Sequence, residues 1–211
     1  MIAIVDYGVG NLFSLSSSVS SLGAEVRVTR DAADLRAADH ILLPGVGAFA
    51  DAMAKLEATG LVPVLREETQ KKPLLGICLG CQILLEHSEE NDVRTLGIVP
   101  GRCVRFPDHM KEEDGSPAPV PHMGWNSLDV VRPGRLLHGI EPGAEFYFVH
   151  SYYVEPAPEL VMATTVYGKE FCSVYGRDGL WAVQCHLEKS GRPGLTVLRN
   201  FYDYCDEVRH A

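Results

Sequence analysis

The stretch Pro73-Leu74-Leu75-Gly76-Ile77-Cys78-Leu79-Gly80 decides the predicted fold, because an apolar run ends there in a cysteine between glycines. The run 74–77 has the length and composition of a buried strand, and a helical pattern follows it. Glycines two positions on either side of Cys78 allow a strained strand-to-helix turn, the nucleophile elbow, which exposes the side chain. The positive end of the helix dipole favours the thiolate there. The pattern therefore predicts a catalytic thiol, with a buried core cysteine as the alternative.

Strands and helices alternate along the chain up to this turn. The strands are expected at 2–6, 25–29, 41–43 and 74–77, and the helices at 12–22, 31–36 and 48–70. Asn11 is predicted to cap the first helix, and Gly23 to end it. Gly60 and Pro63 are predicted to interrupt the third helix. This alternation predicts an α/β fold with a doubly wound, mostly parallel sheet flanked by helices, whose ligands bind beyond the carboxyl ends of the strands.

After residue 97 the pattern changes to short strand-like runs with few helices between them. These runs cover 103–106, 126–131, 145–149, 161–166, 171–175 and 180–183. They predict an antiparallel extension of the sheet, with an exposed loop at 108–121 and a turn at 176–179. The last helix is expected to bury a stripe formed by Leu195, Leu198, Tyr202 and Cys205. Since no linker or repeat interrupts the pattern, we expect a single domain over residues 1–211.

Composition limits the classes of ligand. With 211 residues, 46% of them hydrophobic, the chain is long enough to bury a full core. Its formal net charge of −9 disfavours nucleic acid and anionic membranes as partners, since both would repel it, and favours small-molecule substrates. The start Ile2-Ala3-Ile4-Val5 shows neither a basic leader nor a long apolar segment, so we expect a cytoplasmic protein without a membrane span.

The six cysteines are too few, in a chain of this length, for a disulfide scaffold, and we expect them to be reduced. Cys78 and Cys81 form a CxxC pair, which occurs in redox-active and zinc sites. No second CxxC and no histidine pair with finger spacing follows, so no metal is predicted. A thiol-disulfide switch that uses Cys78 and Cys81 remains an alternative to the catalytic thiol.

A thiol nucleophile needs a base to take its proton, and the base needs an orienting group. The segment Cys185-His186-Leu187-Glu188 lies just after the run 180–183. Two residues apart in an extended or turning segment, His186 and Glu188 can project on the same side, so the carboxylate can hold the imidazole while its other nitrogen faces the thiol. A purely structural role for His186 is the alternative.

A further element is the turn Leu43-Pro44-Gly45-Val46-Gly47. Its glycines leave the backbone free to turn N–H groups toward a developing oxyanion. An ordinary strand-to-helix turn is the alternative interpretation of this segment.

Taken together, the motif around Cys78 and the distant His186 and Glu188 resemble the class I glutamine amidotransferases, an α/β family with a Cys-His-Glu triad that releases ammonia from glutamine. The blocks that carry a closer resemblance, to the glutaminase subunits that serve histidine biosynthesis, are 6–11, 44–49, 122–126 and 146–153. The resemblance implies that Cys78 forms a γ-glutamyl thioester, that His186 moves the proton and that Glu188 orients His186. It also implies an oxyanion held by the backbone N–H groups of Val46 and Leu79.

The resemblance further implies the substrate, the partner and the residues that bind them, and it implies no cofactor. Glutamine would be held by Gly47, Gln82, Glu90, Ser151 and Tyr152. The partner would be a cyclase subunit of the (β/α)8-barrel type, which receives the ammonia within a heterodimer. Its interface would include Asn11, Trp125, Asn126, Tyr147 and Lys189. Gln82 lies one helical turn from Cys78 and can reach the same pocket, with an exposed polar position on the helix as the alternative. Trp125 can anchor an interface, because Trp is enriched in binding hot spots, with a half-buried core Trp as the alternative.

Two positions depart from the family pattern. Leu187 stands where the family usually has proline, and this freer backbone is expected to loosen the spacing between His186 and Glu188. Cys81 stands where methionine is frequent, and we expect it to fill the same space. The departure at Leu187 motivates one alternative, a non-catalytic partner-binding subunit with a decayed triad. An amidotransferase subunit that feeds ammonia to a different synthase is another.

Overall fold

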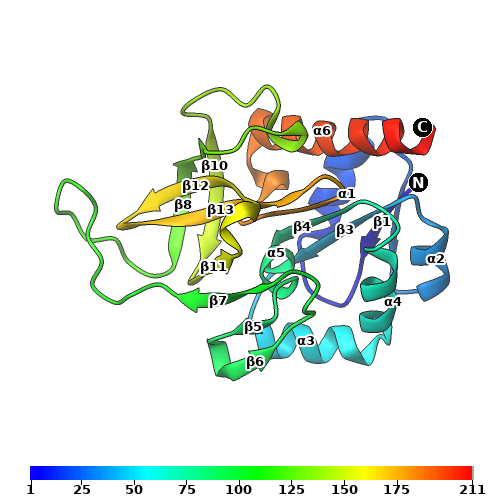
Figure 1. Cartoon of the computed structure of the whole chain (residues 1–211), viewed down its shortest axis with the longest axis horizontal. Coiled ribbons are helices and arrows are strands. Elements are labelled where there is room, and N and C mark those ends of the chain that lie inside the picture. The colour runs from blue at the N-terminus through cyan, green and yellow to red at the C-terminus, as the bar shows by residue number, and fades with distance from the viewer. Residues whose placement is uncertain (211) are drawn as a thin grey trace.

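A twelve-stranded sheet runs through the molecule, and helices cover both faces of its parallel half (Figure 1). The structure is a computed structural model that describes residues 1–210. The parallel half consists, in spatial order, of β2 (Val26–Thr29), β1 (Ile2–Val5), β3 (His40–Gly45), β4 (Leu74–Cys78) and β14 (Leu180–Val183). The prediction of a doubly wound parallel core is therefore confirmed.

Two hydrophobic clusters hold the helices against this half. On one face α1 (Leu12–Ser20) and α6 (Gly191–His210) pack against the sheet, and α2 (Ala32–Ala37), α3 (Phe49–Ala58) and α4 (Leu61–Glu68) pack on the other. Alternate strand residues point to opposite faces, so Ile4 faces α1 and α6 whereas Ala3 and Val5 face the other layer. Each layer is a continuous apolar core, which gives the strand ends a rigid support.

The antiparallel extension is also confirmed. It adds β13 (Lys169–Arg177), β11 (Tyr152–Pro156), β7 (Gly101–Arg105), β5 (His87–Ser88) and β6 (Val93–Arg94) beyond β14, while β12 (Val161–Tyr167) and β9 (Asp129–Val130) branch off from β13. A second sheet pairs β8 (His122–Ser127) with β10 (Glu145–His150). The short helices are α5 (Leu79–Ile83) and the 3-10 turns η1 (Glu90–Asp92), η2 (Arg135–Leu137), η3 (Pro158–Leu160) and η4 (Leu187–Lys189).

Several local predictions are wrong at identifiable positions. The break in the third predicted helix lies at Gly60, whose φ of +73° separates α3 from α4, but Pro63 lies inside the first turn of α4, where a backbone N–H has no helical partner to lose. Asn11 occupies the N-cap position without a side-chain cap hydrogen bond. In the last helix Leu195 is exposed, and the buried stripe runs through Val197, Leu198, Phe201 and Cys205.

The second half contains strands that the sequence pattern did not resolve. The predicted run 126–131 is divided between β8 and β9, which belong to different sheets. β11, β5 and β6 were not predicted at all. The predicted loop at 108–121 carries a single isolated bridge, between Lys111 and Pro117. Within residues 1–210, no helix has both the length and the apolar composition needed to cross a membrane.

Candidate active site

Cys78 is the last residue of β4 and lies directly before α5. Its φ of +55° and ψ of −115° are rare for a residue with a side chain and store backbone strain of about 1–3 kcal/mol. The neighbouring glycines contribute space rather than unusual dihedrals. A Cβ on Gly80 would overlap the Leu43 carbonyl oxygen, and one on Gly76 would press against Leu84. The strained elbow is therefore Cys78 itself, and the two glycines let α5 pack tightly against the strands beneath it.

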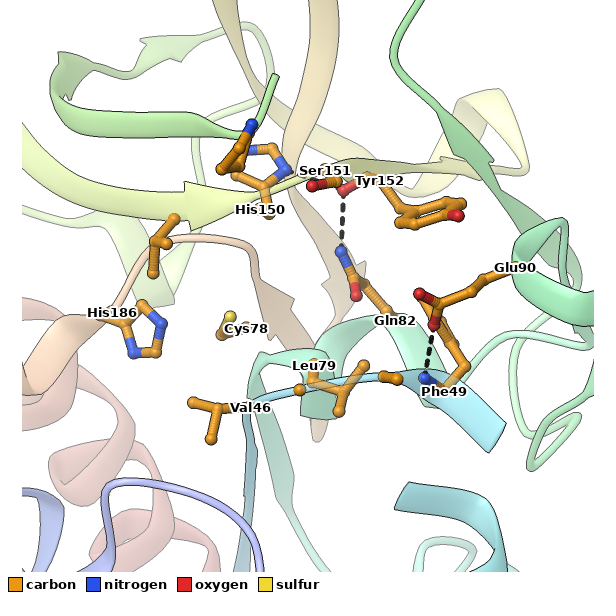
Figure 2. A pocket seen from close by; sticks show the side chains of 14 residues that line it. Val46, Phe49, Cys78, Leu79, Gln82, Glu90, His150, Ser151, Tyr152 and His186 are labelled. Carbon is orange, nitrogen blue, oxygen red and sulfur yellow. Dashed lines mark hydrogen bonds between the residues drawn. The ribbon is translucent and has the colours of Figure 1, made fainter. Parts of the chain in front are cut away.

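Strand register brings the functional segments together. Gly45 pairs with Cys78 across β3 and β4, and Val183 pairs with Ile77 across β14 and β4. Because these three strands are parallel, the residues that follow them emerge at one edge of the sheet. Val46, Leu79 and His186 consequently line the same cavity as Cys78 (Figure 2).

His186 is held between Cys78 and Glu188. Its Nδ1 lies 2.7 Å from Glu188 Oε1, and both side chains are 2% exposed. Its Nε2 is buried and has no hydrogen-bond partner among the described residues, and Figure 2 shows a ring nitrogen turned toward Cys78. The loosening expected from Leu187 is not observed, since Leu187 is 1% exposed within the core and the imidazole–carboxylate contact is short.

The charged forms of His186 and Glu188 stabilise each other. Burial alone lowers the pKa of His186, but the Cys78 sulfur and the Glu188 carboxylate raise it more, and the pKa of His186 reaches about 10. Burial raises the pKa of Glu188, whereas the hydrogen bond and charge of His186 bring that pKa below its ordinary value. An imidazolium paired with a carboxylate is therefore the favoured state, and its Nε2 holds a proton that it is able to give to a group bound beside Cys78.

The cavity beside Cys78 has a volume of about 320 Å³ and contains every residue predicted to bind substrate: Gly47, Gln82, Glu90, Ser151 and Tyr152. The Glu90 carboxylate accepts a 2.6 Å hydrogen bond from the backbone N–H of Phe49, the first residue of α3. Phe49 also meets the Tyr152 ring edge-on, with centroids 5.6 Å apart. The wall opposite His186 thus combines a carboxylate with an aromatic surface (Figure 2).

Gln82 is buried rather than exposed on a helix surface. Its Nε2 donates to the Tyr152 carbonyl oxygen at 2.8 Å and to Gln184 Oε1 at 2.9 Å. Both protons of its amide nitrogen are therefore already donated, so only the carboxamide oxygen is available to a ligand.

Several residues around the cavity were missed from the sequence. His150 lines it, and its Nδ1 donates to the Tyr152 carbonyl at 2.7 Å while its Nε2 accepts from His122 Nδ1 at 3.0 Å. Burial lowers the pKa of His150 to about 3 and that of His122 to about 4, so both rings are neutral donors and acceptors. Gln184, directly after β14, is fully buried. A polar residue at the end of an apolar strand was the available signal for Gln184.

The residues predicted to contact a partner fall into two groups. Trp125 is 54% exposed and meets the half-buried Tyr147 edge-on across β8 and β10, and the Lys189 ammonium lies 5.4 Å from the Tyr147 ring centroid. Asn11 lies beside Glu188. The side chain of Asn126 has a different direction, since its Nδ2 donates to the Val166 carbonyl at 2.9 Å. Four of the five therefore gather near the His186 segment, and Asn126 is occupied within the fold.

The remaining cysteines do not resemble a redox centre. Burial raises the pKa of Cys81 well above its ordinary value, and its thiol donates to Gln184 Oε1 at 3.7 Å. All six cysteines are free. Among residues 1–207, whose side chains the structure describes, no group of three or more histidine, cysteine, aspartate or glutamate side chains is arranged to hold a metal ion. These observations weigh against the thiol-disulfide switch.

Known proteins resemble this chain over its full length. The family model Glutamine amidotransferase class-I matches residues 3–205. The "Imidazole glycerol phosphate synthase subunit HisH" of Desulfovibrio desulfuricans is 60% identical over 100% of both chains, and the protein of the same name from Nitratidesulfovibrio vulgaris is 55% identical over 100% of both.

Solved structures agree at the level of the fold. A putative GMP synthase protein from Thermoplasma acidophilum superimposes with a TM-score of 0.74 at 18% identity, covering 99% of this chain and 95% of that one. The structure of PurLQS from Thermotoga maritima gives 0.72 at 17% identity, with 96% and 97% coverage. The chain belongs to the class I glutamine amidotransferase family and, within it, groups with the HisH subunits of imidazole glycerol phosphate synthase.

Proposed function

We propose that Cys78, His186 and Glu188 hydrolyse glutamine to glutamate and ammonia. The observation that carries this proposal is the position of His186, whose Nδ1 is bound to Glu188 while its buried Nε2 has no hydrogen-bond partner among the described residues. A base held by a carboxylate at one nitrogen and open toward a thiol at the other is the arrangement that a cysteine nucleophile requires.

In the first half of the reaction the Cys78 sulfur attacks the carboxamide carbon of glutamine. The carbon–nitrogen bond breaks as His186 Nε2 gives its proton to the leaving nitrogen, which departs as ammonia and leaves a γ-glutamyl thioester. Backbone N–H groups of Val46 and Leu79 stabilise the oxyanion, and the position of both residues on the cavity wall supports that role.

In the second half His186 takes a proton from water while the water oxygen attacks the thioester carbon. The carbon–sulfur bond breaks, glutamate leaves and the thiolate is restored. Gly47, Gln82, Glu90, Ser151 and Tyr152 hold the substrate, which is supported by their shared cavity. The carboxylate of Glu90 is suited to an ammonium group, and the oxygen of Gln82 to an N–H donor.

The ammonia passes to a cyclase subunit of the (β/α)8-barrel type, which makes imidazole glycerol phosphate and AICAR in histidine biosynthesis. Identity of 60% to a protein named as a subunit of imidazole glycerol phosphate synthase supports this partner. So do the exposed apolar side chains of Met123 and Trp125, which lie two residues apart on β8 and are 61% and 54% exposed. Six free cysteines support a reducing, cytoplasmic location.

The chemistry is tested with the purified chain mixed with the cyclase partner. Glutamate release from glutamine is expected in the unchanged chain and absent in Cys78→Ala, whereas the partner's ammonia-dependent synthesis continues with either chain. Absence of glutamate release in the unchanged chain, with and without partner, would support the decayed-triad alternative.

The partner surface is tested separately by titration. Trp125→Ala is expected to weaken binding of the cyclase about tenfold or more, because exposed tryptophans commonly anchor interfaces. Val28→Ala provides the matched control, since Val28 is an exposed apolar residue on β2, at the far edge of the sheet. Equal affinity of the Trp125→Ala and unchanged chains would place the interface elsewhere.

A further inference from the structure

Gln184 is a buried polar residue that the mechanism above does not use. It is 0% exposed and lies between β14 and His186. Its carboxamide meets three side chains: Oε1 accepts from Gln82 Nε2 at 2.9 Å and from the Cys81 thiol at 3.7 Å, and Nε2 lies 4.0 Å from Cys78 Sγ. A carboxamide that is fully removed from water needs such partners, because an unpaired one is costly.

The backbone carbonyl of Tyr152 determines how the Gln184 carboxamide is oriented, through its hydrogen bond with Gln82. The carbonyl oxygen of Tyr152 can only accept, so the group of Gln82 that lies 2.8 Å from it is the amide nitrogen. The same nitrogen lies 2.9 Å from Gln184, whose facing atom must then be the oxygen. The amide nitrogen of Gln184 is thereby left on the side of Cys78. The Tyr152 carbonyl on β11 thus fixes the orientation of both carboxamides, and the second of them presents its N–H to the Cys78 sulfur.

We infer that Gln184 donates a hydrogen bond to Cys78 Sγ and so favours the thiolate over the thiol. The inference rests on the proposed role of Cys78 as nucleophile. A thiolate accepts hydrogen bonds far better than a thiol does, so a donor held toward the sulfur stabilises the charged form selectively. Because an amide does not titrate, Gln184 provides this without competing with His186 for the proton.

Other titratable groups also act on Cys78 and must stay constant in a test. His186 faces it from the segment after β14, and Glu188 acts on it through His186. Tyr7, Cys81 and Cys185 also interact with it, but burial raises the pKa of each of them, so none is charged near neutral pH and loss of the Cys81 thiol changes no charge there. Replacement of Gln184 by an uncharged residue of similar size leaves all of these groups in place.

The test measures the rate at which iodoacetamide alkylates Cys78 in the full chain as a function of pH, read at the Cys78 peptide by mass spectrometry. Burial raises the pKa of each of the other five cysteines, so they react slowly near neutral pH. In Gln184→Met the donor is lost, and the midpoint of the profile is expected to move upward by about half to one pH unit.

Two further variants separate a donor from a general packing effect. Gln82→Met frees the carboxamide of Gln184 to rotate, so the midpoint should move in the same direction by a smaller amount. Cys81→Ala removes a neighbour of the same Gln184 oxygen without changing the orientation, so its midpoint should equal that of the unchanged chain.

An unchanged midpoint in Gln184→Met overturns the inference, as does a Cys81→Ala shift of the same size. If Gln184→Met does not fold, Gln82→Met decides alone, and an unchanged midpoint there has the same meaning. Alkylation needs no glutamine, so failure of this inference is distinguishable from failure of the proposed function, which would appear as missing glutamate release.

Discussion

Asn11 Nδ2 lies 3.3 Å from Glu188 Oε1, the same oxygen that holds His186 Nδ1 at 2.7 Å. The two residues come from opposite ends of the chain and meet because α1 packs against η4. Asn11 therefore does not cap its own helix, as the sequence pattern predicted, but contacts the carboxylate of the proposed triad. A residue expected at the partner surface is thus one hydrogen bond away from the carboxylate that orients the proposed base.

Replacement of Asn11 tests this contact. In Asn11→Ala the Glu188 carboxylate loses one donor while its bond to His186 remains, so kcat for glutamate release with the partner should fall about three- to tenfold with little change in KM. Ser17→Ala, at an exposed position on the same helix, is the control. If Asn11→Ala changes only the affinity for the partner, the hydrogen bond to Glu188 has no part in turnover.

Removal of the Glu188 charge should affect His186 directly. The carboxylate raises the pKa of His186, so Glu188→Gln should lower that pKa and reduce kcat about 10⁴-fold, as loss of the orienting carboxylate does in Ser-His-Asp triads. A titration of the His186 ring by NMR reports the first effect. If the pKa of His186 stays near 10 in this variant, Cys78 alone is responsible for raising it.

The same pair predicts how stability depends on pH. His186 has a folded pKa of about 10, above its unfolded value near 6.5, so its stabilising contribution is complete below about pH 6.5 and is lost as pH rises toward 10. The difference in unfolding free energy between the unchanged chain and Glu188→Gln should narrow over that interval, which denaturant unfolding at several pH values measures. A difference that stays constant from pH 6.5 to 10 contradicts this linkage.

His150 predicts the opposite trend on the acid side. Its folded pKa of about 3 lies below the unfolded value, so the unfolded chain binds more protons between pH 6.5 and 3, and His150 reduces stability as pH falls. In His150→Gln the slope of unfolding free energy against pH should decrease by up to about 1.4 kcal/mol per pH unit. His138→Gln, at an exposed position, should leave the slope unchanged.

Gly80 should tolerate no side chain, because a Cβ there would overlap the Leu43 carbonyl oxygen. Gly80→Ala should therefore reduce the free energy of unfolding by about 3 kcal/mol or more, since α5 cannot move away from β3 without disturbing the elbow. Gly23→Ala is the matched control. Gly23 has a φ of +88° and open space around it, so only the dihedral cost of about 1 kcal/mol applies. Equal losses in the two variants would show that packing at Gly80 is unimportant.

The parallel half was predictable because its elements have strong local signals. β1, β3 and β4 are apolar runs that lead into glycine-containing turns, and the helices have apolar stripes. The second half has weaker signals, and β11 and the division between β8 and β9 depend on which strands pair in space. Leu195 was assigned to the buried stripe because periodicity alone does not say which of two adjacent stripes faces the sheet.

The residues of the site also divide into some that the sequence predicts and others that only the structure reveals. Cys78, His186 and Glu188 could be proposed from motifs at strand ends, because parallel strands place their ends together. Gln184, His150 and His122 could not, since a buried polar residue becomes recognisable only when its partners are known, and those partners lie on β8, β10, α5 and β11. The role of the glycines around Cys78 also needed the structure, which shows a packing requirement where the pattern suggested backbone flexibility.

The most direct test of the proposed reaction is to mix the chain and its partner with glutamine, quench with acid during turnover and examine the Cys78 peptide by mass spectrometry. The account predicts that this peptide gains the mass of one γ-glutamyl group, and that the adduct disappears in Cys78→Ala together with glutamate release. Glutamate release without an adduct at Cys78, or in the Cys78→Ala chain, would contradict the account.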